Sequence, residues 1–344
     1  MLSPMYTDRM KITPGKLSGM KAVADGRGVI AAAAMDQRGS LKKALAKERG
    51  GDVGDRELEE FKTLVTEVLT PHASAILLDP EWGIPASRRR AKNAGLLMAY
   101  EKTGYDAATP GRLPDLLDDW SVRRIKEAGA DCIKILLYYT PEDPKSINER
   151  KHAWVERIGD ECRANDIPFF LELVGYEEGA DEKGAAFAKK KPQIVAGSMK
   201  EFGQDRYGVD VLKVEIPINM KFVEGARASS GTSAYSKQEA KDAFRRAADV
   251  STRPFIYLSA GVSNAEFAES LELAAEAGTR FSGVLCGRAT WKDGIAVYGK
   301  QGADAFRKWL EHEGVKNIAN VNEHLKPARP WFEFYGAKSA DELA

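Results

Sequence analysis

The sequence lacks the features that would assign it to several large classes of protein. It has no apolar run near the roughly 20 residues needed to cross a membrane, and residues 1–16 lack the apolar core of a secretion signal. Its 51 basic and 51 acidic side chains give a formal net charge of +0. No global field therefore favours nucleic acid or a membrane surface. We expect a soluble, cytoplasmic protein that binds neither.

Cysteine and histidine are scarce and scattered. Cys132, Cys162 and Cys286 are too few and too widely spaced for a disulfide framework or a zinc site, and we expect them to be buried and reduced. The four histidines form no cluster with the spacing of metal ligands; they are His72, His152, His312 and His324. We therefore expect a protein without a metal or another cofactor.

What the 344 residues do contain is an alternation of short apolar strands with amphipathic helices. Eight such strands, separated mostly by helical patterns, predict the parallel TIM (β/α)8 barrel. A doubly wound sheet is the competing fold, but no glycine-rich phosphate fingerprint follows the first strand. The predicted strands are 28–35, 74–79, 94–100, 131–137, 168–174, 209–216, 255–260 and 282–286.

The barrel is expected to span residues 28–325, between an N-terminal extension (1–27) and a C-terminal tail (326–344). One short helix of the extension should cover the bottom of the barrel. Residues 176–191 are expected to be a solvated connection, and the small residues of 221–235 suit a flexible flap. Helices are predicted over 58–69, 113–128, 193–202, 296–312 and 315–325, with further starts at Thr140–Asp143, at Ser236 with Glu239 and at Ser263 with Glu266.

Three neighbouring strands each carry an ionisable residue on the face that period-two alternation assigns to the interior: Lys134, Glu172 and Lys213. A buried, unpaired ammonium is costly and tends to lower its pKa, which makes the amine a nucleophile. The trio fits Schiff-base catalysis, in which one amine attacks a ketone and the carboxylate moves protons. A buried structural network is the alternative. We favour catalysis, with Lys213 as nucleophile over Lys134, because Pro217 and the loop beyond place Lys213 beside an entrance.

Other candidate residues follow the strands. Asp36 could hold a substrate hydroxyl, assist proton transfer, or simply bond local backbone amides. Gln37 and Arg38 come next, and Arg38 is the candidate for a second anionic group. Barrels commonly bind phosphate after their last two strands, although such residues also make ordinary turns. The phosphate candidates there are Ser259, Gly261, Gly287 and Arg288.

Longer runs of the sequence resemble one known family. In chain order they are AMDQRGSLK, LLDPEWG, GLLMAYEKTGYD, KILLYY, IPFFLELVGY, LKVEIPIN, YLSAGVS and GVLCGRATW. Over about residues 25 to 325 the chain resembles the tagatose 1,6-bisphosphate aldolase family.

The resemblance implies a metal-independent class I aldolase that cleaves the small-molecule ketose bisphosphate D-tagatose 1,6-bisphosphate to glycerone phosphate and D-glyceraldehyde 3-phosphate. It implies that Lys213 forms the Schiff base, that Glu172 transfers protons, and that Asp36 and Lys134 line the site. Fructose 1,6-bisphosphate is implied as a second substrate, and association into a homo-oligomer is left open. Two alternatives stand beside this function: a class I aldolase for a 6-sulfo sugar 1-phosphate, and a phosphosugar-binding regulator without turnover.

Overall fold

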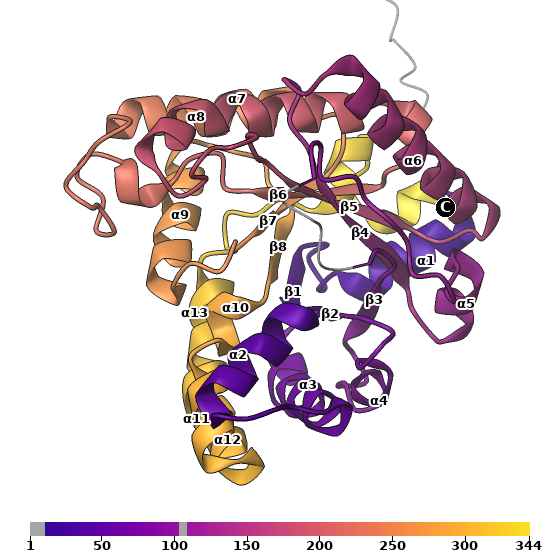
Figure 1. Ribbon diagram of the computed structural model, residues 1–344. Coiled ribbons are helices and arrows are strands. Elements are labelled where there is room, and N and C mark those ends of the chain that lie inside the picture. Colours follow the sequence, from indigo (N-terminus) through magenta and orange to yellow (C-terminus); the bar gives the residue numbers. More distant parts are fainter. Residues whose placement is uncertain (1–10, 103–108) are drawn as a thin grey trace, which may run out of the picture.

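The computed structural model of the chain describes residues 11–102 and 109–344 (Figure 1). Residues 1–10 of the predicted extension and residues 103–108, at the end of the GLLMAYEKTGYD run, lie outside the described part. The centre is a closed barrel in which each strand pairs in parallel with the next and β8 pairs with β1, so the predicted TIM barrel is confirmed. The strands are β1 Ile30–Ala34, β2 Ala75–Leu78, β3 Gly95–Ala99, β4 Cys132–Tyr138, β5 Phe169–Val174, β6 Val211–Glu215, β7 Phe255–Leu258 and β8 Gly283–Cys286.

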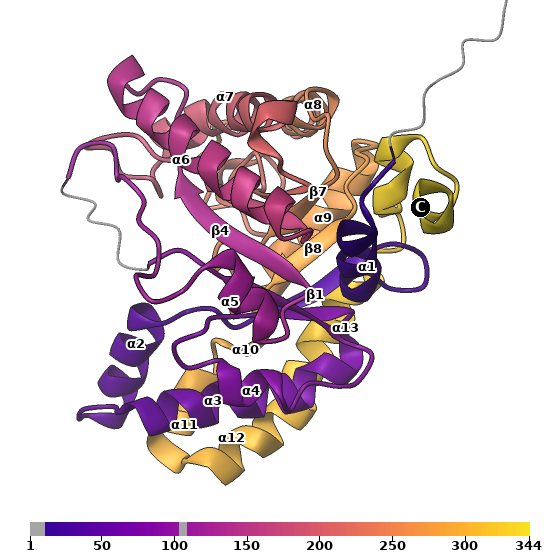
Figure 2. The same ribbon diagram turned by 90° about the vertical axis from the view of Figure 1, so that its right-hand side faces the viewer.

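Helices lie between the strands and surround the barrel (Figures 1 and 2). Apolar side chains at three- and four-residue spacing, such as Leu58, Phe61 and Val65 in α3, face the strands and are buried. The helices are α1 Pro14–Val23, α2 Gly39–Arg49, α3 Asp55–Leu69, α4 Ile84–Ser87, α5 Val122–Glu127, α6 Lys145–Ala164, α7 Ala185–Phe202, α8 Lys237–Asp249, α9 Asn264–Glu276, α10 Arg288–Trp291, α11 Gly294–Gln301, α12 Ala303–Trp309 and α13 Val315–Glu323.

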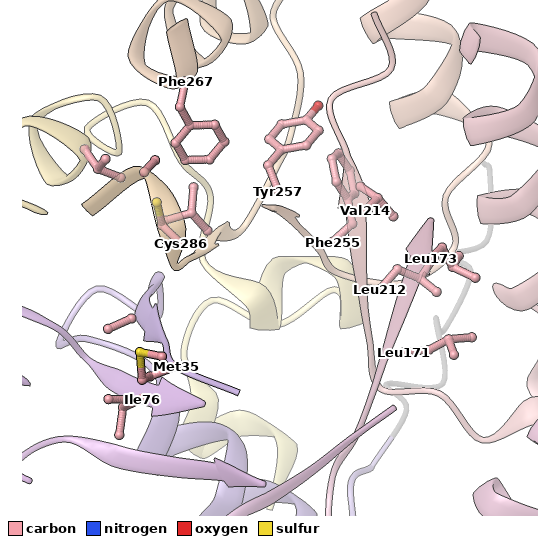
Figure 3. Close-up of a cluster of buried hydrophobic side chains, with 14 of the residues drawn as sticks. Met35, Ile76, Leu171, Leu173, Leu212, Val214, Phe255, Tyr257, Phe267 and Cys286 are labelled. Carbon is pink, nitrogen blue, oxygen red and sulfur yellow. The ribbon is translucent and has the colours of Figure 1, made fainter. Parts of the chain in front are cut away.

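The residues of each strand alternate between the outside and the inside of the barrel. Leu171, Leu212 and Val214 belong to the outer core between strands and helices (Figure 3). The inward residues form a second core of small and aliphatic side chains, which includes Ile30, Ala32, Ala34, Ala75, Leu77, Leu97, Ala99, Cys132, Phe170, Val211, Ile256 and Leu285. Inward positions nearer the carboxyl ends of β4, β5 and β6 hold charged residues instead, and these form the site described below.

The bottom of the barrel is closed by both the predicted N-terminal helix and the tail. Helix α1 packs Leu17, Met20 and Val23 onto the inner core, as expected. The tail adds Trp331 and Leu343 from two 3-10 helices, Trp331–Tyr335 and Ala340–Leu343. The two segments lie side by side at the ends of the strands in Figure 2. They seal the end of the barrel opposite the carboxyl ends of the strands.

Two predicted helix positions are wrong. The helix predicted over 113–128 covers only α5, because the backbone before it pairs with the chain that follows β3: Lys102 N–H donates to the Asp115 carbonyl and Leu117 N–H to the Tyr100 carbonyl. The predicted start at Thr140–Asp143 is a turn, and α6 begins at Lys145 after Pro144. The Asp143 carboxylate pairs with Lys151 at 2.9 Å and so does not act in the first turn of the helix.

Two predicted loops are more ordered than expected. Helix α7 begins at Ala185, inside the segment predicted as a solvated connection, because Phe187 and Ala188 are buried there. The segment predicted as a flap is held in place by two contacts: Val223 bridges to Tyr235, and the buried Tyr235 hydroxyl donates to the Ala188 carbonyl.

The helix predicted over 296–312 is divided at Gly302 into α11 and α12.

Several smaller expectations are confirmed. Ser236 and Glu239 form the reciprocal capping box that opens α8, and the Ser263 hydroxyl accepts a hydrogen bond from the Glu266 N–H at the start of α9. The three cysteines are buried and free. Among the described helices, none has the length and apolar character that crossing a membrane requires.

Candidate active site

The barrel fold brings Lys134, Glu172 and Lys213 together. Glu172 in β5 is in register with Lys213 in β6, and Lys134 lies on the neighbouring strand β4 with its side chain inside the barrel. Lys134 is 0% exposed and Lys213 4%. The period-two alternation of each strand therefore places all three side chains in the interior, as the sequence predicts.

Glu172 joins the two lysines. Its Oε2 lies 2.7 Å from Lys134 Nζ and 2.8 Å from Lys213 Nζ, although neither contact is aligned as a hydrogen bond. Asp36, just beyond β1, accepts a hydrogen bond from Lys134 Nζ at 2.9 Å. The four residues that the sequence analysis singled out as catalytic candidates thus form one contiguous chain of charges.

Glu101 also belongs to this chain of charges, although no sequence pattern predicted it. Its Oε1 accepts a hydrogen bond from Lys134 Nζ at 2.8 Å, and the residue is 3% exposed. Its position two residues beyond β3, like that of Asp36 two residues beyond β1, is the signal that could have found it.

The electrostatics fix the charge of most of the cluster. Burial opposes the charge on Lys134, but its three carboxylate neighbours outweigh burial and raise the pKa of Lys134 well above its usual value. Burial alone would also raise the pKa of Glu172 and of Asp36. The two lysines outweigh it and hold the pKa of both carboxyl groups below the usual range. Lys134 is thus an ammonium between carboxylates at neutral pH.

A cavity of about 710 Å³ opens above this cluster. It reaches down to Glu172 and is bounded by the carboxyl ends of β4 to β8 and the loops that follow. Five basic residues and four acidic residues line it: Lys183, Lys191, Lys221, Arg288, Lys292, Glu172, Glu182, Glu215 and Glu266.

Three of the predicted phosphate-binding residues line the cavity together: Ser259, Gly261 and Arg288. The Arg288 guanidinium lies directly over Gly261, since a Cβ added there would be 2.9 Å from its Cζ. Lys292 Nζ donates to the Gly261 carbonyl at 2.9 Å. Among the described residues, Arg288 has no carboxylate partner, so its charge is available to an anion in the cavity.

The remaining three binding candidates do not lie on the cavity wall. A Cβ at Gly287 would be 2.8 Å from the Ala34 carbonyl oxygen, so this glycine allows β8 to approach β1 closely. The Gln37 carbonyl accepts a hydrogen bond from Lys62 at 2.7 Å, and the Gln37 side chain is not among those that line the cavity.

Arg38 does not support the expected role in binding a second anion. It is 1% exposed, and its guanidinium contacts Glu81 Oε2 and the Glu101 carbonyl, each at 2.6 Å. It therefore ties together the segments that follow β1, β2 and β3. Sequence spacing alone could not show this, because the partners of Arg38 come from two other strand ends.

A closed (β/α)8 barrel with buried amines beneath a cavity at the carboxyl ends of its strands is typical of an enzyme. Among the residues that the structure describes, no three His, Cys, Asp or Glu side chains are grouped so that they could hold a metal ion. A family model described as DeoC/LacD family aldolase matches residues 30–293. The chain belongs to this family and is an aldolase, a carbon–carbon lyase.

Proteins of three bacteria show how far the similarity extends. One from Listeria monocytogenes serovar 1/2a, named tagatose 1,6-diphosphate aldolase, is 52% identical over 330 residues, which cover 95% of this chain and 97% of its own. Tagatose 1,6-diphosphate aldolase 1 of Enterococcus faecalis is 52% identical over 92% of this chain and 96% of its own. Tagatose 1,6-diphosphate aldolase 2 of Streptococcus pyogenes serotype M1 is 54% identical over 89% and 94%.

Proposed function

We propose that this aldolase cleaves D-tagatose 1,6-bisphosphate to glycerone phosphate and D-glyceraldehyde 3-phosphate through a Schiff base on Lys213, and that it also accepts D-fructose 1,6-bisphosphate. The observation that carries the proposal is the contact of Lys213 Nζ with Glu172 at 2.8 Å, beneath a cavity that basic residues such as Arg288 and Lys292 help to line. Identities of 52% and 54% to proteins named tagatose 1,6-diphosphate aldolase support the choice of substrate.

Lys213 suits the role of nucleophile better than Lys134. Within the described part of the chain, Lys213 has ion-pair contact with Glu172 alone, whereas Lys134 contacts three carboxylates. The three carboxylates hold Lys134 as a cation. A proton that leaves Lys213 can pass to Glu172, whose Oε2 lies 2.8 Å away, and Lys134 then balances the charges of Asp36 and Glu101.

In the proposed reaction, the Lys213 amine adds to the C2 carbonyl. Glu172 returns its proton to the resulting C2 hydroxyl, which leaves as water and gives a protonated imine. Glu172 then accepts the proton of the C4 hydroxyl while the C3–C4 bond breaks. The electron pair of that bond moves into the imine and forms an enamine, and D-glyceraldehyde 3-phosphate leaves. Protonation at C3 and addition of water release glycerone phosphate and restore the amine. We propose that Asp36, which accepts a hydrogen bond from Lys134 Nζ at 2.9 Å, holds a substrate hydroxyl.

The C1 phosphate is proposed to lie at the ends of β7 and β8. Arg288 and Lys292 flank Gly261 there and supply two positive charges, and the Ser259 hydroxyl lies on the same wall. Ala260, between Ser259 and Gly261, has a left-handed backbone with φ of 48°. Such strain in a residue other than glycine is concentrated at functional sites.

Reductive trapping tests the proposal. The protein is incubated with glycerone phosphate and borohydride, digested with trypsin and analysed by mass spectrometry. An adduct on Lys213 blocks cleavage there and joins residues 207–213 to residues 214–221 in one peptide. Lys213→Met should abolish the adduct. Lys183→Met, at a lysine that lines the cavity, should retain it.

An adduct on Lys134, or none, would contradict the assignment of Lys213. Turnover rates then decide the substrate: the proposal requires that D-tagatose 1,6-bisphosphate be cleaved faster than a 6-sulfo sugar 1-phosphate. A regulator without turnover would cleave neither.

A further inference from the structure

A further positively charged group, Arg112, lies against Tyr138 at the carboxyl end of β4, beside the cavity. Arg112, in the segment before α5, places its Cζ 4.5 Å from the centre of the Tyr176 ring and 5.1 Å from that of Tyr138. Tyr138 is the last residue of β4 and lines the cavity. The two rings hold the guanidinium by cation–π contacts and restrict its side-chain freedom.

The strand order places Arg112 on the side of the barrel opposite the proposed C1-phosphate site. In a closed barrel of eight strands, β4 and β8 are four strands apart in either direction and so lie on opposite walls. Lys213 in β6 is two strands from each. A ketose bisphosphate whose C2 is bound to Lys213 and whose C1 phosphate lies near Arg288 therefore directs its other end toward the wall of Arg112.

The guanidinium of Arg112 is held by a carboxylate that a substrate anion could replace. Its Nη2 lies 2.6 Å from Glu182 Oε1, but that contact is not aligned as a hydrogen bond. Arg112 Nε is buried and has no hydrogen-bond partner among the described residues. Glu182 itself lines the cavity. Among the described residues, the guanidinium thus has an N–H donor without a partner, and its neighbours Tyr138 and Glu182 line the cavity.

We propose that Arg112 binds the anionic group at the far end of the substrate, the C6 phosphate, and that Glu182 occupies this position in the free protein. The inference rests on the proposed function for the identity of the substrate. A planar guanidinium can give a phosphate two parallel hydrogen bonds, which a carboxylate partner with poor alignment does not use. On binding, the phosphate replaces Glu182 as the partner of Arg112.

The other basic residues on this side suit the role less well. Lys191 pairs with Glu215 at 3.1 Å, and the second oxygen of Glu215 accepts a hydrogen bond from the Gly175 N–H at 2.8 Å, so this pair is anchored to the backbone. Lys183 is exposed, and no aromatic ring of the described residues makes a cation–π contact with it like those that hold Arg112. Lys183 is therefore the matched control.

The test compares two substrates that differ only in the distal phosphate: D-tagatose 1,6-bisphosphate and D-tagatose 1-phosphate. Arg112→Gln should lower kcat/KM for the bisphosphate by roughly 10- to 100-fold, which is the usual effect of losing a hydrogen-bonded charge, and change that for the 1-phosphate by less than about threefold. Lys183→Gln should change neither appreciably. Arg112→Lys should lower kcat/KM for the bisphosphate less than Arg112→Gln does, because lysine keeps the positive charge but lacks the two parallel N–H donors of the guanidinium.

Glu182→Gln provides the complementary result. It removes the competing carboxylate, so the KM for the bisphosphate should fall while that for the 1-phosphate stays the same. An equal loss with both substrates in Arg112→Gln, or no loss with the bisphosphate, would overturn the proposal for Arg112. A higher KM for the bisphosphate in Glu182→Gln would overturn the role of Glu182.

Binding keeps this inference separate from the proposed chemistry. In the Lys213→Met background, calorimetry measures the dissociation constants of both sugars without turnover. The bisphosphate should bind at least about 10-fold more tightly than the 1-phosphate, and Arg112→Gln should remove that advantage. If borohydride trapping fails but this advantage depends on Arg112, the Schiff base is wrong and the anion site stands. If trapping succeeds but Arg112→Gln leaves the advantage intact, the Schiff base on Lys213 stands and the proposal for Arg112 is wrong.

Discussion

Replacing Lys134 by methionine is the most informative perturbation of the site, because the side chain keeps its approximate volume and loses its charge. Lys134 Nζ lies 2.9, 2.8 and 2.7 Å from the carboxylates of Asp36, Glu101 and Glu172. At an effective dielectric constant of about 20, each contact corresponds to a gross Coulomb energy of about 6 kcal/mol. The desolvation of the ammonium opposes this, and removing one partner of a buried ion pair typically costs about 3–5 kcal/mol.

The predicted loss depends on pH, and its sign follows from the pKa shifts. In the wild type, the pKa values of Asp36 and Glu172 lie below their usual values, so these carboxylates contribute stability above the unfolded pKa that is lost as pH falls. In Lys134→Met the same groups are buried with less compensation, and their pKa values rise. They then destabilise the fold while ionised, and protonation relieves them at lower pH. The difference in stability between wild type and variant should therefore be largest near neutral pH and shrink toward pH 5.

Urea denaturation measures this difference. At pH 7.5 the free energy of unfolding should fall by about 3–5 kcal/mol, and by less at pH 5. The same substitution at Lys102 is the control, since Lys102 also contacts two carboxylates, those of Asp115 and Asp118, but is partly exposed. It should have a much smaller effect. A loss below about 1 kcal/mol for Lys134→Met, or a loss that is the same at both pH values, would refute the view of Lys134 as the buried counter-ion of three carboxylates.

Three further predictions concern other parts of the molecule. Glu172→Gln should retain the borohydride adduct on Lys213 but lower kcat by about 100-fold or more, because the proton acceptor is lost; unchanged turnover would remove Glu172 from the mechanism. Gly261→Ala should raise KM, because its Cβ meets the Arg288 guanidinium, whereas Gly225→Ala has a similar φ, 72° against 79°, but open space and should leave KM unchanged; equal KM values in the two variants would contradict this role. Trp331→Ala should lower the free energy of unfolding by about 3–5 kcal/mol in urea denaturation while kcat/KM of the folded protein stays the same, and a change in kcat/KM would show that the bottom of the barrel influences the site.

The sequence predicts the barrel and much of the site because both follow from local periodicity. Alternation at period two assigns Lys134, Glu172 and Lys213 to one side of their strands. Parallel pairing of consecutive strands then brings the Nζ atoms of Lys134 and Lys213 within 2.8 Å of Glu172 Oε2. No long-range information is needed for this step beyond the number of strands.

What the sequence could not predict depends on contacts between distant segments. Arg38 follows β1 like a binding residue, yet Glu81 and the Glu101 carbonyl bury it. Gly287 looks like part of a phosphate loop, but its lack of a side chain serves the contact with the Ala34 carbonyl. The late start of α6 has a similar cause, since the Asp143 carboxylate is held by Lys151 and by the hydroxyl of Tyr176, which follows β5.

The closure of the barrel bottom has a practical consequence for attaching this protein to a surface. Ile12 N–H donates to the Leu343 carbonyl at 3.1 Å, so both segments meet on the sealed face (Figure 2). An anchor joined to the chain near either residue would orient the immobilised molecule with its open mouth toward the solution. Protein attached to beads in this way should turn over substrate at the same rate per molecule as the free protein. Random coupling through surface lysines would instead block the cavity opening in a fraction of the molecules.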